Sequence, residues 1–249
     1  MNTRSACQPC KKRGGETFRP VPVRWIITCS LALTFALPLV AQSPELQQKL
    51  AAVQQSMAAN KMRLQRYQWI ETTQLTLKGD PKPPSQNLCQ YGPGGQVQKS
   101  LITPPPPPPS GGRLKQRVVA NKTEQMQDYM GDVKNLLTLY VPPDPQKMQQ
   151  AFAAGNVSLN PSSGLVNLVF KNYAQPGDQM TITFDPATKK VISLSVQTYM
   201  GQSKDAVTLQ VQMGSLPDGT NYAQQTVLNA TAKQLVVTTT NSDYRMIGG

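Results

Sequence analysis

Apolar and polar residues alternate with a period of two through most of the chain after Asn156. Val207 and Leu209 point to one side of such a run, whereas Thr208 points to the other. Six strand-like runs are recognised, at residues 165–171, 179–185, 190–199, 206–214, 222–230 and 233–240. The turn sequences between them are too short for the crossovers that parallel strands need, so the strands are predicted to be antiparallel.

The apolar face of this sheet needs a cover, because a sheet that is apolar on one side must pack against helices or curl upon itself. Helical spacing is found in three segments, at residues 44–66, 121–140 and 144–155, and further strands are predicted at residues 67–77, 87–91 and 96–102. In the first helix Leu46, Leu50 and Val53 share one face. The predicted fold class is α+β: a strongly curved antiparallel sheet, or half-open barrel, whose apolar face is covered by an N-terminal helix and a mid-chain helical insertion.

The first residues are typical of a secretory signal peptide. A basic region around Lys12 is followed by an uncharged run at residues 25–40 and then by small residues that favour cleavage within 41–43. The alternative is a retained membrane anchor, but the run is shorter than the ~20 residues that span a bilayer. We predict a signal peptide at residues 1–42 and a single domain at residues 43–249, periplasmic or, in a single-membrane host, secreted.

Charge alone would suggest a nucleic-acid partner, since 25 Lys and Arg oppose 13 Asp and Glu, for a net charge of +12. The leader holds 6 of these basic residues and 1 of the acids, which leaves +7 on the mature chain. The remaining positive charges are dispersed and are not interleaved with aromatic residues, as a stacking platform would require. We therefore expect no nucleic-acid partner and, at most, a weak attraction to anionic membranes.

The chain contains no histidine, which excludes Ser-His-Asp and Cys-His catalysis and His-ligated metals. Of its four cysteines only Cys89 lies outside the leader, so the mature protein has no internal disulfide, and Cys89 is read as a partly buried free thiol. Asp128 and Asp132 share a helix face, which solvated helix surface explains. We expect no enzyme, no cofactor and no metal site; the alternative is carboxylate-only metal binding or glycosidase chemistry.

A run of six prolines, residues 104–109, lies within a flexible insertion at about residues 103–113. Such a run favours an extended polyproline II rod and excludes a helix or a central strand. It is interpreted either as a docking peptide for an aromatic groove or as a tolerated surface insertion.

The order of elements resembles that of the outer-membrane lipoprotein carrier superfamily. The shared features are an N-terminal amphipathic helix, the strand entry at residues 67–73 (YQWIETT), a mid-chain helical insertion and a long terminal β-meander. The resemblance implies an incomplete β-barrel, closed by helices, that holds acyl chains in an apolar cavity and hands lipid or lipoprotein across the periplasm.

Two classes of function follow from these observations. The first is a non-enzymatic envelope protein whose concave face binds a lipid, an acyl chain or another apolar ligand, unless the same residues form a core sealed by the helices. The predicted ligand-binding residues are Trp69, Leu75, Phe170, Phe184, Leu209 and Val211. The second is an envelope scaffold with a filled core that engages protein partners through the proline-rich segment or an edge strand.

Overall fold

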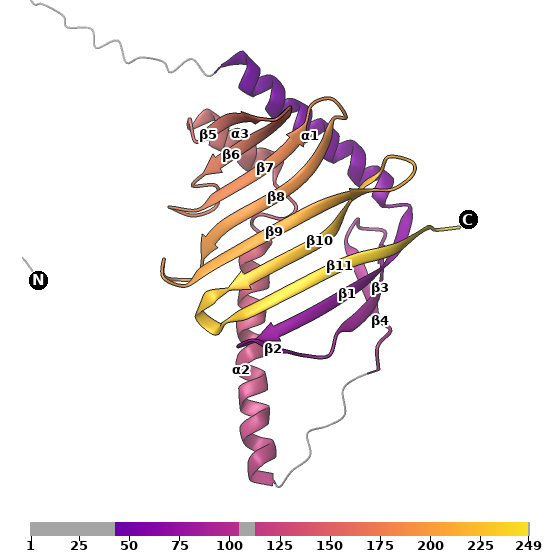
Figure 1. The fold of residues 1–249 in the computed structure, drawn as a ribbon, viewed down its shortest axis with the longest axis vertical. Coiled ribbons are helices and arrows are strands. Elements are labelled where there is room, and N and C mark those ends of the chain that lie inside the picture. Colours follow the sequence, from indigo (N-terminus) through magenta and orange to yellow (C-terminus); the bar gives the residue numbers. More distant parts are fainter. Residues whose placement is uncertain (1–42, 105–112, 249) are drawn as a thin grey trace, which may run out of the picture. The chain divides into compact units, whose positions relative to one another are not determined.

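One antiparallel sheet organises the chain (Figure 1). The computed structural model describes residues 43–104 and 113–248, so the predicted signal peptide and the prolines at 105–109 lie outside the described residues. The described elements belong to one compact unit, Val40–Gly249. The strands are β1 (Tyr67–Leu77), β2 (Asp80–Pro81), β3 (Ser85–Tyr91), β4 (Val97–Leu101), β5 (Val157–Ser162), β6 (Leu165–Lys171), β7 (Gln179–Asp185), β8 (Lys190–Tyr199), β9 (Ala206–Ser215), β10 (Asn221–Ala230) and β11 (Leu235–Met246).

The strands follow the order β4-β3-β1-β11-β10-β9-β8-β7-β6-β5, with β2 paired to β1. Strands β5 to β11 form a meander of sequence neighbours, and β1 then pairs with β11 and joins the N-terminal hairpin to it. In the described part of the chain β4 and β5 are the two edges, so the curved sheet does not close. This architecture confirms the predicted fold class.

Strand register collects the apolar side chains on one face. Val196 pairs with Leu209, Leu194 with Val211, and Phe170 with Met180. Residues that pair directly across antiparallel strands project from the same face, so these partners form a continuous apolar surface.

Three helices accompany the sheet. Helix α1 (Pro44–Leu64) begins at Ser43, whose hydroxyl accepts a hydrogen bond from the Leu46 amide at 3.2 Å. Helix α2 (Arg113–Leu137) leads to the short helix α3 (Pro145–Ala153), which Asp144 caps in the same way through the Gln146 amide. No helix among the described residues is long and apolar enough to span a membrane.

Buried apolar residues form two clusters. The main cluster joins α1 and α3 to strands β6 to β9, and the second joins the C-terminal half of α2, through Val133, to Val207, Ala230 and Leu235. The helices therefore cover the apolar face of the sheet, as its one-sided pattern requires.

Three elements differ from the sequence-based expectation. Strand β2 pairs Asp80 and Pro81 with β1, although no strand was predicted there. Helix α2 was predicted from residue 121 but begins at Arg113, and its N-terminal half extends past β2 in Figure 1. Strand β5 was not recognised because Pro161 interrupts it, and an edge strand tolerates a proline that a central strand would not.

Candidate functional site

Four of the six predicted ligand-binding residues lie together beneath the helices. Phe170, Phe184, Leu209 and Val211 come from β6, β7 and β9, and their side chains are between 0 and 6% exposed. They share the main cluster with Leu50 and Val53 of α1 and with Met148 and Ala151 of α3. The apolar concave face is therefore packed directly against these two helices.

The other two predicted residues lie elsewhere on the sheet. Leu75 is half-buried and packs against the second cluster, under α2. Trp69 belongs to a group of aromatic rings, with its ring 5.5 Å from Tyr91 and 5.5 Å from Tyr244, and its indole N–H donates to Asn241 Oδ1 at 3.1 Å. Six residues of extended strand separate Trp69 from Leu75 by about 20 Å, so one small ligand would not contact both.

A buried carboxylate ties the junction between α2 and α3 to the sheet. Asp178, in the β6–β7 turn, is 2% exposed. Its donors are the Tyr140 hydroxyl at 2.6 Å and the amides of Tyr173, Ala174 and Gln175 at 2.6, 2.9 and 2.8 Å. The Tyr140 oxygen also lies 2.8 Å from Thr198 Oγ1 on β8. Burial, and then the hydrogen bond to Asp178, raise the pKa of Tyr140, so its hydroxyl stays protonated at neutral pH.

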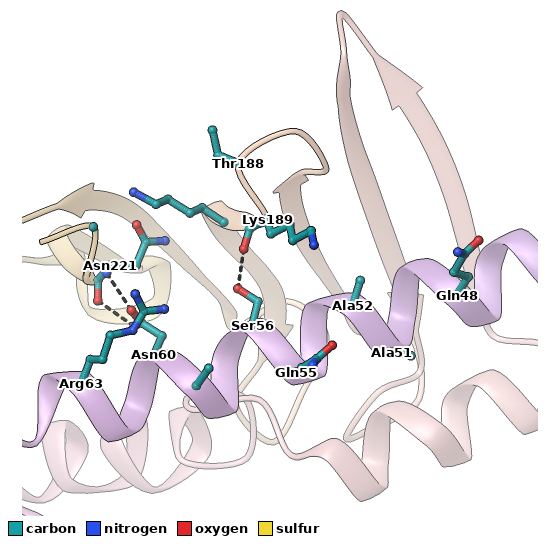
Figure 2. A pocket seen from close by; sticks show the side chains of 13 residues that line it. Gln48, Ala51, Ala52, Gln55, Ser56, Asn60, Arg63, Thr188, Lys189 and Asn221 are labelled. Carbon is teal, nitrogen blue, oxygen red and sulfur yellow. Dashed lines mark hydrogen bonds between the residues drawn. The ribbon is translucent and has the colours of Figure 1, made fainter.

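Helix α1 is held less firmly. Only Leu46, Leu50 and Val53 of its 21 residues are buried. Towards its C-terminus the Ser56 hydroxyl donates to the Lys189 carbonyl at 2.6 Å. Asn60 exchanges two hydrogen bonds of 2.7 Å with the backbone of Asn221 (Figure 2).

A groove runs along this flank of α1, between the helix and the β7–β8 and β9–β10 turns (Figure 2). Its volume is ≈ 690 Å³. The floor is formed by the small side chains Ala51, Ala52 and Ala59, and the charged side chains at its wall are Arg63, Lys189 and Lys190. The sequence analysis did not identify this site. The adjacent Lys189 and Lys190 near a turn can be seen in the sequence, but Arg63 lines the same groove only because of where α1 lies in the fold.

In the described part of the chain, no three or more Cys, Asp or Glu side chains gather as a metal site would require. Cys89 is a free, fully buried thiol, and burial raises the pKa of that thiol. Helix α1 separates two surfaces, the apolar face of the sheet and the basic groove, and each has side chains suited to binding a ligand.

Comparison with known proteins gives no family assignment. No protein-family model matches the sequence, and no curated protein matches it either. Among solved structures, the chain is similar to a DUF1329 family protein from Desulfovibrio piger, with a TM-score of 0.40 and 7% identity over 82% of this chain and 94% of that one. It is also similar to a domain named for outer membrane lipoprotein sorting from Vibrio parahaemolyticus, with a TM-score of 0.40 and 10% identity over the same shares. At these scores neither likeness assigns the chain to a family.

Proposed function

We propose that this protein is a non-enzymatic binding protein of the cell envelope that holds an apolar ligand, such as an acyl chain, between the concave face of its sheet and helix α1. The proposal rests chiefly on one observation: α1, which covers the main apolar surface of the sheet together with α3, is a largely polar helix with three buried side chains and two partly buried ones, Ala52 and Met57, on that surface. The leader sequence, typical of export, supports the location.

In this proposal α1 is the movable part of the cover and the α2–α3 junction is the fixed part. Buried hydrogen bonds join Tyr140 of the junction to Asp178 in the β6–β7 turn and to Thr198 on β8. Helix α1 relies on its buried Leu46, Leu50 and Val53, on the partly buried Ala52 and Met57, and on a few side-chain hydrogen bonds. Burying a side chain of this size contributes about 1.5–3 kcal/mol, and each methylene of a ligand about 0.8 kcal/mol. An acyl chain of about 14 methylenes therefore offers enough apolar burial to replace α1 on the sheet.

The test is lipid binding by the wild type and by a variant with space under α1. Leu50→Ala removes a fully buried side chain and opens an apolar void that favours an apolar ligand. Met62→Ala, on the same helix but 66% exposed, is the matched control. We expect native mass spectrometry of protein purified from membranes to detect bound lipid, and we expect Leu50→Ala to take up more of a fluorescent fatty acid than Met62→Ala. If no lipid co-purifies and neither the wild type nor Leu50→Ala takes up the fatty acid, the proposal is overturned.

A second candidate, an envelope interaction protein, is favoured by the edge strand β4. All five of its residues are exposed, and Leu101 and the following Ile102 are 59 and 52% exposed. The opposite edge is protected by Pro161, whereas β4 offers unpaired backbone groups beside apolar side chains.

This candidate is tested on the edge itself. Leu101→Lys should abolish capture of a protein partner that binds by strand addition, whereas Met246→Lys, at an equally exposed position on β11, should not. Deletion of residues 104–112 separates the edge from the proline-rich segment as the point of contact. Unchanged capture by Leu101→Lys would exclude β4.

A further inference from the structure

The three cations of the α1 groove lack acidic partners. Ion pairs among the described residues join Lys82 to Asp80 and Lys99 to Glu71, and neither involves the groove. Arg63 projects from α1, Lys189 lies in the β7–β8 turn, and Lys190 is the first residue of β8. Like charges that line one groove repel one another, and an anion bound there would reduce that repulsion.

The nearby carboxylates of Asp185 and Asp218 accept hydrogen bonds from residues outside the groove's charged set. Asp185 accepts hydrogen bonds from the Ala187 amide at 2.9 Å and from the Thr188 hydroxyl at 2.7 Å. Asp218 accepts from the amide and hydroxyl of Thr220 and from the Tyr67 hydroxyl, at 2.8–2.9 Å. They moderate the local potential, but they leave the cationic groups of the groove available to a ligand.

Other contacts hold the groove open and in place. The hydrogen bonds of Ser56 and Asn60 to the backbone of the two turns set the spacing between helix and sheet. Lys190 Nζ donates to Ser215 Oγ at 3.0 Å, which leaves two further ammonium protons. The alanine floor and the volume of ≈ 690 Å³ leave room for a ligand of several heavy atoms.

We propose that this groove binds a phosphate group, either free or as the headgroup of an anionic lipid. A guanidinium presents a planar fork of donors and the two ammonium groups add point charges, and this combination suits the several oxygens of a phosphate. The charged residues of the site lie outside the main apolar cluster, on the outer flank of α1, and the groove is formed while α1 lies on the sheet.

Lys189 offers a variant that removes charge and preserves the turn. Its backbone adopts φ 56, which glycine adopts readily, and Ser56 bonds to its carbonyl and not to its side chain. Lys78, with φ 54, is a lysine in the same conformation in the β1–β2 turn. Lys189→Gly and Lys78→Gly are therefore matched in charge and in backbone conformation.

The experiment is a titration with inorganic phosphate, followed through the backbone amide NMR shifts and compared with sodium chloride at equal ionic strength. We expect saturable shifts at Ser56, Asn60 and Lys189 in the wild type, and binding about tenfold weaker in Lys189→Gly and in Arg63→Gln. Lys78→Gly should bind as the wild type does. Shifts that do not saturate, or equal binding by Lys189→Gly and Lys78→Gly, would overturn the proposal.

Vesicle binding identifies the source of the phosphate. If the groove recognises a headgroup, the wild type co-sediments with vesicles of phosphatidylcholine and phosphatidylglycerol more than with phosphatidylcholine alone, and Lys189→Gly loses this difference while Lys78→Gly keeps it. If both variants co-sediment with the vesicles alike, while only Lys189→Gly binds inorganic phosphate more weakly, the ligand is a soluble phosphate. Because neither measurement uses the apolar face, failure here is distinguishable from failure of acyl-chain binding.

Discussion

Replacing the buried Asp178 tests whether the α2–α3 junction is the fixed part of the helical cover. The Asp178 carboxylate accepts four hydrogen bonds, three at Oδ2 and one at Oδ1, from donors that are buried or half-buried. Asp178→Asn preserves the volume but has one acceptor oxygen. With that oxygen at the Oδ2 position, the new amide group faces the Tyr173 N–H, so two donors meet without an acceptor.

The expected loss follows from these contacts. One buried donor left unpaired costs about 1–3 kcal/mol, and the remaining bonds lose their charge assistance, so Asp178→Asn should lower the free energy of unfolding by about 2–4 kcal/mol. Asp178→Ala leaves all four donors without an acceptor and should lower the free energy of unfolding further. Tyr140→Phe removes a single hydroxyl and should cost about 1–2 kcal/mol.

Urea denaturation followed by circular dichroism measures these losses, provided that the slope of the transition is unchanged. The double variant Asp178→Asn/Tyr140→Phe should lose less than the sum of the two single losses, because both substitutions break the same hydrogen bond. A midpoint for Asp178→Asn equal to that of the wild type, or strictly additive losses, would refute the inference that this network anchors the junction.

Three further predictions concern other parts of the fold. Cys89 is fully buried and its thiol pKa is raised, so the native protein should react with Ellman's reagent far more slowly than the urea-unfolded protein; equal rates would contradict the burial. Hydrogen bonds from Thr220 hold the pKa of Asp218 below its usual range, so the contribution of Asp218 to folding stability is present above about pH 4 and is lost as the pH falls through its lower folded-state pKa. Urea titrations from about pH 5 to 2.5 should therefore show the stability difference between wild type and Asp218→Asn shrinking as the pH falls. A Cβ atom at Gly214 would lie 2.8 Å from the Tyr222 ring, so Gly214→Val should lower the melting temperature, with a loss of about 1–3 kcal/mol that a wild-type-like melt would rule out.

Much of the architecture was predictable because strand and helix periodicity are local signals. The alternation at residues 206–214 is observed as β9, and the spacing of Leu46, Leu50 and Val53 is observed as the buried face of α1. The segments that were missed lack such a signal: β5 contains a proline, and no apolar stripe was recognised in the sequence of α2 before residue 121.

The candidate site was predictable only in part. Phe170, Phe184, Leu209 and Val211 were correctly placed on one face, because alternation within a strand determines the side to which a residue points. Alternation says nothing about distance along the strand, so Trp69 and Leu75 were grouped with residues that they do not join. Whether the four residues that do come together bind a ligand stays a prediction.

By itself, therefore, the sequence determined the strands, their antiparallel pairing and the need for a helical cover, because each depends on residue period and turn length. Tertiary structure alone decided how the cover is attached and where charge gathers. The network at Asp178 joins the segment after α2 to the β6–β7 turn and to β8, and the basic groove places Arg63 beside lysines more than a hundred residues away. The first juxtaposition depends on where the segment after α2 meets the sheet and the second on where α1 crosses the ends of the strands, and no local pattern encodes either position.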